Sequence, residues 1–334
     1  LRTIGIFNES YLQFLKNIQL PDYELTFEDD SIELRFSGLW HESIYWEIFA
    51  LAIINELYSR EEIDRLSHFE EELVLARGLI RLGNKIKLLR KYPGILFSDF
   101  GTRRRFSFEW QDRVIQAIKG EIPNQLIGTS NVFLAKRYSL APIGTSAHEM
   151  FQIGSGIYHY SDEAIRNSQN RIFEMWWQQY EYGLSIFLPD TFGSEFTFKT
   201  LPKEWVEKWK GFRQDSGDPF VFGERVIKLY QDLGIDPKSK LIIFSDALTV
   251  DKIVKLYTHF KDRIKVSFGW GTNLTNDLGL FQPLSMVIKV IEANDHKVVK
   301  LSDNIAKAVG DSEEIAIFKR IFGYQSTVNE TCIY

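Results

Sequence analysis

Short apolar runs alternate with polar turns through most of the chain. The runs cover residues 95–100, 125–127, 140–143, 184–188, 209–212, 241–244 and 264–268. Each run has the length of a buried strand, and most are followed by a polar or glycine-containing turn and then by a helical pattern. Repeated strand–helix units predict a parallel sheet in an α/β fold, and this many units predict an irregular α/β barrel.

The first 92 residues follow a different pattern. Residues 31–38 alternate polar and apolar side chains and predict a strand that ends at Gly38. A charged helix is predicted over residues 61–92, ended by Pro93 and Gly94. Residues 41–60 predict an earlier helix whose apolar side chains we expect to be buried. These are Trp46, Phe49, Leu51, Ile53, Ile54 and Leu57.

The C-terminal part predicts a β-hairpin. Its strands would be residues 285–292 and 297–300, with Asn294 and Asp295 at the turn. Because the hairpin has no helix of its own, we expect it to join the sheet of the N-terminal domain. The pattern thus predicts an N-terminal α/β domain (1–92), a barrel with the active site (93–280), and a returning hairpin and tail (281–334). The chain begins at Leu1 without Met, so we expect a truncated N-terminus.

Composition narrows the classes of function. The chain has 334 residues and a net charge of −5, which argues against a broad nucleic-acid surface. Cys332 is the only cysteine, so an internal disulfide is excluded and a reducing, cytoplasmic location is expected. The longest apolar run, residues 48–54, is too short to span a membrane.

The turn at residues 213–219 carries the densest chemistry. Asp218 fits a helix N-cap and Pro219 the first helical position. Arg213 can hold a phosphate or a carboxylate, and Asp215 can hold hydroxyls or Mg2+. Any one such turn could be a capped turn with surface charges. The turns of a barrel meet at one rim, however, so their recurrence predicts a shared site.

Other turns add anion-binding groups and exclude some cofactors. Arg103 and Arg104 are cationic, Asp246 is a carboxylate at a strand end, and two glycine turns at residues 128–130 and 269–272 offer backbone N–H groups to phosphate. Walker A, Rossmann and zinc-ligand spacings are missing from the sequence. The residues predict a pocket for a phosphorylated, hydroxyl-rich ligand with Mg2+.

Seven motifs together resemble those of the nicotinate phosphoribosyltransferase family. They span residues 99–107, 128–131, 144–149, 213–219, 244–246, 268–275 and 300–303, in order and over almost the whole chain. The resemblance implies a type II phosphoribosyltransferase fold and a homodimer with a shared active site. It implies synthesis of nicotinate mononucleotide and pyrophosphate from nicotinate and phosphoribosyl pyrophosphate, with Mg2+ and ATP, as the first step of NAD salvage.

The resemblance also implies roles for single residues. Phe100 would stack on the pyridine ring, and Arg103 and Arg104 would hold the nicotinate carboxylate or the pyrophosphate. The remaining roles concern the base, the ribose, the 5′-phosphate and the phosphoryl group from ATP. Arg213 would reach the base and the ribose, and Asp215 and Asp246 would bind the ribose hydroxyls. The 5′-phosphate would be bound by Gly269, Gly271 and Thr272. His148 would become the phosphohistidine.

The chemistry of the residues is consistent with this. Displacing pyrophosphate from an anomeric carbon leaves anionic charge on the leaving group, which arginines, Mg2+ and backbone N–H groups stabilise. The pyridine nitrogen is already a nucleophile, so no strong general base is needed. A lone histidine such as His148 is most often a packed or surface residue, but its ring nitrogen can also accept a phosphoryl group.

The turn at Ser130 and Asn131 bears on the choice of base. It carries hydrogen-bond donors and no carboxylate, and a buried carboxylate there would repel a substrate carboxylate. We therefore expect nicotinate. The alternatives are a nicotinamide or quinolinate phosphoribosyltransferase, a non-catalytic relative that binds pyridine or phosphoribosyl pyrophosphate, and an unrelated sugar-phosphate barrel.

Three features depart from the family pattern. Trp270 replaces a small aliphatic residue and could narrow the phosphate pocket or pack outward. Residues 304–307 read Asn-Ile-Ala-Lys where Asn-Pro-Gly-Lys is expected. Residues 1–30 do not match the usual Asp-x-Tyr-Lys segment, whose tyrosine would stack on the base in the neighbouring subunit.

Overall fold

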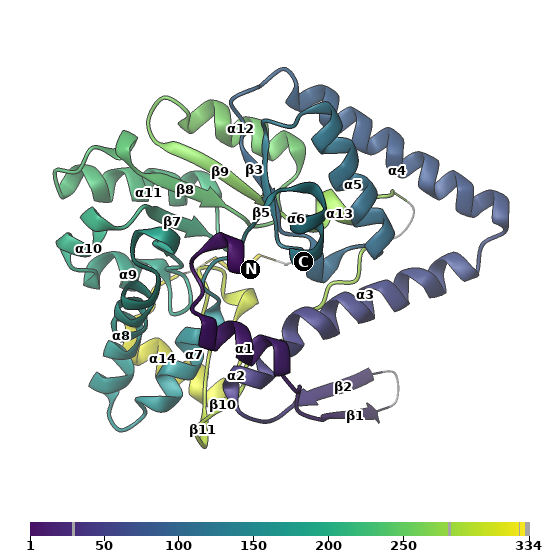
Figure 1. Cartoon of the computed structure of the whole chain (residues 1–334). Coiled ribbons are helices and arrows are strands. Elements are labelled where there is room, and N and C mark those ends of the chain that lie inside the picture. Colours follow the sequence, from purple (N-terminus) through teal and green to yellow (C-terminus); the bar gives the residue numbers. More distant parts are fainter. Residues whose placement is uncertain (29–30, 280–281, 327, 331–334) are drawn as a thin grey trace.

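A computed structural model describes residues 1–28, 31–279, 282–326 and 328–330. Cys332 lies outside these ranges. Within them, no helix is both long and apolar enough to cross a bilayer. Figure 1 shows the arrangement of the elements.

The seven predicted strands form one parallel sheet. Their bounds are β3 (Phe97–Asp99), β4 (Leu126–Thr129), β5 (Ala141–Pro142), β6 (Ile186–Phe187), β7 (Gly211–Gln214), β8 (Leu241–Phe244) and β9 (Lys265–Trp270). The order across the sheet is β5-β4-β3-β9-β8-β7-β6. β3 and β9, the first and last strands of this sheet in the sequence, pair with each other. The strands therefore follow their sequence order around a circle that is interrupted between β5 and β6. The predicted irregular α/β barrel is confirmed as a curled sheet that, in the described residues, stays open at this break.

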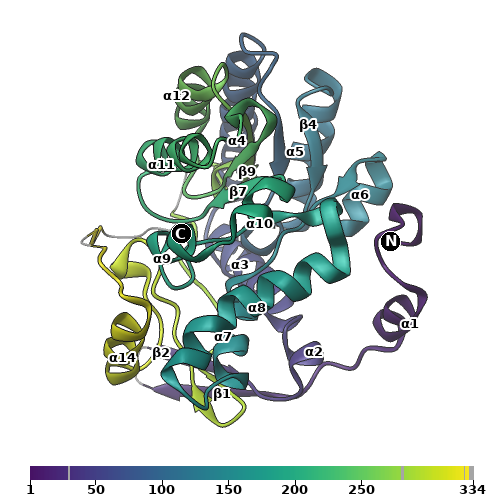
Figure 2. The ribbon, with the colours of Figure 1, turned by 90° about the vertical axis from the view of Figure 1, so that its left-hand side faces the viewer.

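Helices connect the strands and cover the sheet. Between β5 and β6 the chain forms α7 (His148–Ile157), α8 (Asp162–Tyr180) and the short η3 (Glu181–Leu184). Figure 2 shows α7 and α8 from the side. The other connections hold α5 (Phe108–Glu121), α6 (Val132–Tyr138), α9 (Ser194–Thr200), α10 (Lys203–Lys208), α11 (Pro219–Asp232), η4 (Pro237–Ser239) and α12 (Val250–Phe260). Asp218 caps α11 by accepting from the backbone N–H groups of Phe220 and Val221, as the sequence predicted.

Aromatic side chains dominate the core of the barrel. Phe97, Phe212, Phe244 and Phe268 are fully buried on the strands, and Phe187 stacks on Trp209 with ring centroids 3.8 Å apart. Burying such large rings supplies much of the hydrophobic stabilisation of a fold. The strand ends that carry the polar turns are thereby held in fixed positions.

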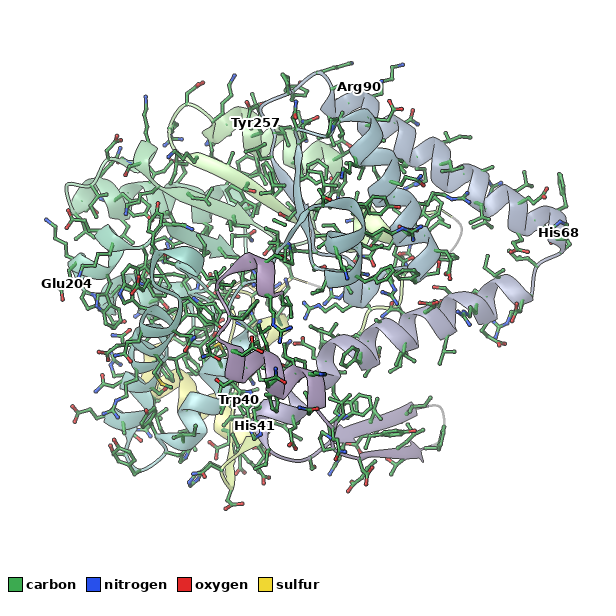
Figure 3. All side chains as sticks on the ribbon, viewed as in Figure 1. Trp40, His41, His68, Arg90, Glu204 and Tyr257 are labelled. Atoms are coloured by element: carbon green, nitrogen blue, oxygen red, sulfur yellow. The ribbon has the colours of Figure 1, made fainter. Side chains whose placement is uncertain are left out.

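The N-terminal region is a set of helices beside a small hairpin. It comprises η1 (Arg2–Ile4), α1 (Glu9–Asn17), β1 (Tyr23–Glu28), β2 (Ser31–Phe36), α2 (Trp40–Ser43), α3 (Trp46–Asp64) and α4 (His68–Leu89). The predicted helix over 61–92 actually starts after a turn, because Ser67 and Glu70 form a reciprocal capping box. His68 lies at the tip of the pair formed by α3 and α4 (Figure 3).

The predicted burial of the first long helix is partly wrong. Leu51 is fully buried, but Phe49, Ile53 and Leu57 are 48%, 53% and 57% exposed. The face of α3 that packs inward carries small and polar residues. Asn55 donates to the backbone oxygen of Arg103, so this face fits closely against the turn η2 (Thr102–Arg104). The apolar stripe of α3 is left on the surface.

The C-terminal hairpin is shorter than predicted and lies elsewhere. Its strands are β10 (Glu292–Ala293) and β11 (His296–Lys297), and both turn residues, Asn294 and Asp295, have positive φ as a tight hairpin turn requires. Among the described residues the two strands pair only with each other, so the expectation that they join the N-terminal sheet is wrong. Ala293 packs instead against Gly156 and Ile153 of α7.

Three short elements complete the described chain. The helix α13 (Thr272–Thr275) follows β9, and η5 (Ile305–Lys307) and α14 (Ser312–Phe322) follow the hairpin.

Candidate active site

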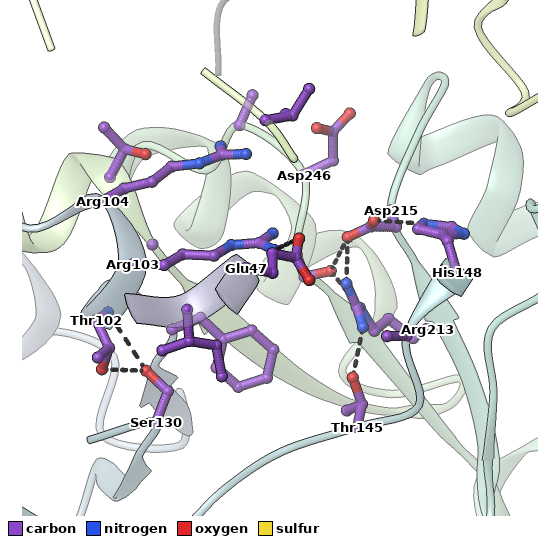
Figure 4. Close-up of a pocket in the computed structure, with 18 of the residues that line it drawn as sticks. Glu47, Thr102, Arg103, Arg104, Ser130, Thr145, His148, Arg213, Asp215 and Asp246 are labelled. Carbon is purple, nitrogen blue, oxygen red and sulfur yellow. Dashed lines mark hydrogen bonds and ion pairs between the residues drawn. The ribbon is translucent and has the colours of Figure 1, made fainter. Parts of the chain in front are cut away.

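A cavity of about 510 Å³ opens where the carboxyl ends of the strands meet (Figure 4). Most residues singled out from the sequence line this one cavity. They are Phe100, Arg103, Arg104, Ser130, His148, Arg213, Asp215, Asp246, Gly271 and Thr272. The predicted convergence of the strand-end turns on a common pocket is therefore confirmed.

Asn131 and Gly269 do not line the cavity, and both support residues that do. The Asn131 side chain caps α6 and donates to Gln111. Gly269 lies behind the ring of Phe100, where an added Cβ would come within 2.5 Å of ring carbons. These residues therefore shape the site from behind, in place of the direct contacts that we expected.

The loop after β3 is fixed by a buried carboxylate. Asp99 accepts hydrogen bonds from the Gly101 N–H, the Thr129 hydroxyl and the Gln111 amide, each at 2.7 Å. Burial raises the pKa of Asp99, although these donors oppose the shift. The carboxyl group anchors the backbone that presents Phe100 and the arginines.

Arg103 is held by a residue from the N-terminal region. Its Nη1 lies 2.5 Å from Oε1 of Glu47 on α3, and the same oxygen lies 3.1 Å from Nζ of Lys289. Burial alone would raise the pKa of Glu47, but the charges of Arg103 and Lys289 outweigh it and lower that pKa. One carboxylate therefore sets the position of two cations at the pocket wall.

Arg213 and Asp215 form a second ion pair at the end of β7. Arg213 Nη2 lies 2.6 Å from Asp215 Oδ1, its Nε donates to Ser245 at 2.9 Å, and its Nη1 donates to Thr145. Burial opposes ionisation of Asp215, but Arg213 and the other partners hold its pKa well below the usual value. Asp215 is therefore an anion at neutral pH.

His148 is the first residue of α7, next to this pair. Its Nε2 lies 2.9 Å from Asp215 Oδ2 and 3.7 Å from Asp190 Oδ1, and its Nδ1 lies 3.0 Å from the Thr191 hydroxyl. Burial, helped by the charge of Lys300, lowers the pKa of His148 to about 4 despite the two carboxylates. The ring is thus neutral at pH 7. A carboxylate can only accept, so Nε2 carries the proton and Nδ1 accepts from Thr191.

Comparison with known proteins agrees with this geometry. The family model described as the nicotinate phosphoribosyltransferase (NAPRTase) family matches residues 95–326. The chain belongs to this family. A solved nicotinate phosphoribosyltransferase from Porphyromonas gingivalis is 34% identical and superposes with a TM-score of 0.85, over 96% of this chain and 82% of that one. One from Vibrio cholerae is 32% identical with a TM-score of 0.87, over 96% and 78%.

Two of the three departures from the nicotinate phosphoribosyltransferase pattern, at Trp270 and at residues 304–307, leave the pocket intact. Trp270 is 1% exposed and packs edge-on against Phe97, with ring centroids 5.6 Å apart, so it points into the core and away from the phosphate turn. At residues 304–307, Asn304 still caps the turn and Lys307 Nζ lies 2.5 Å from Asp246 Oδ1. The lysine therefore reaches the site without the usual Pro-Gly.

Sequence reasoning missed several charged residues of this nicotinate phosphoribosyltransferase site. Glu47, Lys289, Lys300 and Lys307 all line the cavity. Two of them carried a readable signal: Glu47 follows Trp46 and precedes Ile48, and Lys289 lies within the apolar run 286–291. A single charge inside an apolar run is seldom buried without a partner. Their pairing with each other could not be read from spacing.

Proposed function

We propose that the protein transfers the phosphoribosyl group of phosphoribosyl pyrophosphate to nicotinate. The observation that carries this proposal is the convergence of one aromatic ring, several cations and two strand-end carboxylates on one cavity. Phe100 would stack on the base, with Gly269 leaving room for its ring. Asp215 and Asp246 would hold the ribose hydroxyls, and the glycine turn at Gly271 would offer backbone N–H groups to the 5′-phosphate.

The turn at Ser130 supports nicotinate as the base. Ser130 Oγ lies 2.7 Å from the Thr102 hydroxyl, and the carboxylate of Glu47 in the same cavity is already paired with Arg103 and Lys289. Hydroxyl groups can donate to a substrate carboxylate, whereas an aspartate would repel it. The test is to compare kcat/KM for nicotinate, nicotinamide and quinolinate with purified enzyme. Turnover of nicotinamide or quinolinate at the rate for nicotinate would overturn the assignment.

We also propose that ATP phosphorylates His148. The neutral, buried ring lines the cavity beside Asp215, which accepts a hydrogen bond from Nε2–H and so leaves the lone pair on Nδ1 as the nucleophile. The experiment is to incubate the protein with γ-labelled ATP and to assay acid-labile phosphate on the chain. Label is expected on the wild type and not on His148→Ala. An unlabelled wild type that nevertheless binds both substrates would favour a non-catalytic binding protein.

Mg2+ is the proposed cofactor. Asp190 Oδ1 is buried and, among the described residues, accepts no hydrogen bond, and it shares the neighbourhood of His148 with Asp215. Carboxylate oxygens are the ligands that Mg2+ prefers, so these two residues fit the ion. When bound, Mg2+ would neutralise phosphate charge on the substrates. Removal of Mg2+ with a chelator is expected to abolish turnover, and added Mg2+ to restore it.

A homodimer is proposed from the surface of α3 and α4. The exposed apolar stripe of Phe49, Ile53 and Leu57 on α3 is joined by Phe69 and Ile80 on α4, 68% and 64% exposed. Solvent-exposed apolar patches of this kind mark contact surfaces. The two helices project from the rest of the chain (Figure 1), so a second copy could pack along them. Light scattering after size exclusion should give twice the chain mass.

We also propose that the enzyme is located in the cytoplasm, as its single cysteine suggests.

A further inference from the structure

Lys300 is tied to the same backbone that holds His148. Its backbone N–H and C=O both pair with Val309, and the next residue, Leu301, donates to the Thr191 oxygen at 2.8 Å. Thr191 in turn contacts His148 Nδ1 through its hydroxyl. Lys300 therefore lies beside the histidine, is 4% exposed, and lines the same cavity.

Lys300 differs from the other cations of the pocket in its pairing. Arg103 and Lys289 share Glu47, Arg213 pairs with Asp215, and Lys307 pairs with Asp246. Within the described part of the chain, the Lys300 ammonium forms no ion pair within 4.0 Å, although its charge helps to lower the pKa of Asp215. A buried ammonium without an anion is costly, so such groups are usually paired.

The surroundings of His148 define where an anion would be needed. Asp215 and Asp190 already face Nε2, so a phosphoryl group placed there would meet two negative charges. Arg213 is neutralised by Asp215. Lys300, the buried cation next to the histidine, forms no ion pair within 4.0 Å in the described ranges, although its charge also acts on Asp215.

We propose that Lys300 is the counter-ion of the phosphoryl group on His148. The proposal rests on the phosphohistidine proposed above. In that step the lone pair of Nδ1 bonds to the γ-phosphorus of ATP, the bond from this phosphorus to the β–γ bridging oxygen breaks, and ADP leaves with the electron pair, while Nε2 keeps its proton in the hydrogen bond to Asp215. The Lys300 ammonium then pairs with the new dianion. Lys300 thus stabilises the phosphorylated enzyme, and the pyrophosphate of the substrate is held elsewhere in the pocket.

The test compares Lys300→Met with the matched control Lys297→Met, an exposed lysine of the same segment. With γ-labelled ATP, loss of a charge-assisted contact should shorten the half-life of the phosphoenzyme about tenfold or more in Lys300→Met, while Lys300→Arg and the control keep it. An unlabelled wild type overturns both proposals. If the wild type is labelled but the phosphoenzyme of Lys300→Met has the same half-life as that of the wild type, only the proposed role of Lys300 is overturned.

Two further measurements separate the alternatives. If the charge is unpaired before phosphorylation, Lys300→Met without ATP should melt at or above the wild-type temperature, and a large loss of stability or a failure to fold contradicts the proposal. Pyrophosphate binding, measured by calorimetry, should be nearly unchanged. Tenfold weaker pyrophosphate binding with a normal phosphoenzyme half-life would assign Lys300 to pyrophosphate and overturn the proposal.

Discussion

Glu47 on α3 and Arg103 after β3 form an ion pair at the wall of the cavity, with 2.5 Å between Oε1 and Nη1. The two residues belong to different parts of the fold, the N-terminal helices and the barrel. Lys289, from the segment before the C-terminal hairpin, completes the group. Three distant segments therefore meet at the end of the pocket where the base is proposed to bind.

Glu47→Gln should weaken nicotinate binding. The change leaves Arg103 and Lys289 as two neighbouring cations without their carboxylate, so Arg103 loses its fixed position. We expect the KM for nicotinate to rise about tenfold with a smaller change in kcat, and the variant to lose ~1–3 kcal/mol of stability. Steady-state kinetics and thermal melting check this. The control is Glu61→Gln, a surface pair on the same helix; equal effects of the two variants would contradict the assigned role.

Gly269→Ala should displace the ring of Phe100. An added Cβ would lie 2.5 Å from the ring carbons, so the ring must move into the cavity. We expect the KM for nicotinate to rise severalfold while the protein stays folded. Gly83→Ala is the matched control, because nothing lies within 4 Å of its added Cβ and a helical alanine should stabilise α4 by about 0.5–1 kcal/mol. An unchanged KM in Gly269→Ala would show that the ring does not contact the base.

Glu149→Gln should stabilise the protein at high pH. Burial, with help from the Glu47 charge, raises the pKa of Glu149 to about 7 from the ordinary 4.5. A raised acid pKa means that the folded chain holds this proton more tightly than the unfolded chain. Its stabilising contribution is complete below pH 4.5 and is lost as the pH rises through 7.

The glutamine variant cannot ionise, so its melting temperature should exceed that of the wild type at pH 8.5 and match it near pH 4.5. The difference at high pH should be on the order of 2 kcal/mol. Melting curves across this range give the result. Glu174→Gln, an exposed position on α8, should show no such pH dependence. A constant offset for Glu149→Gln at all pH values would mean that its carboxyl group titrates normally.

Ser130→Asp should reverse the preference between bases. A carboxylate beside Thr102 would repel the carboxylate of nicotinate and could accept from the amide of nicotinamide. We expect kcat/KM for nicotinate to fall by about a hundredfold, with a gain for nicotinamide. Ser130→Ala, which removes the hydroxyl without adding charge, should lower nicotinate turnover only modestly. A Ser130→Asp enzyme that still prefers nicotinate would place base selection at another residue.

The sequence determined the strands, the polar turns that follow them and most of the residues at the cavity. Apolar runs that end in Gly-, Asp- and Arg-containing turns are local signals, and parallel strands necessarily bring those turns to one edge. The cap formed by Asp218 and the hairpin turn at Asn294 and Asp295 were readable for the same reason.

Only the tertiary structure decided which charges are paired and which faces are buried. Helical periodicity marked the apolar positions of α3 but could not show that Asn55 and its small neighbours face inward, leaving Phe49 and Ile53 exposed. Nor could spacing show that Glu47 pairs with Lys289, or that Lys300 forms no close ion pair in the described residues, because ion pairs depend on distances between segments far apart in the chain. Burial and charge balance at His148 follow from that packing, which no local pattern encodes.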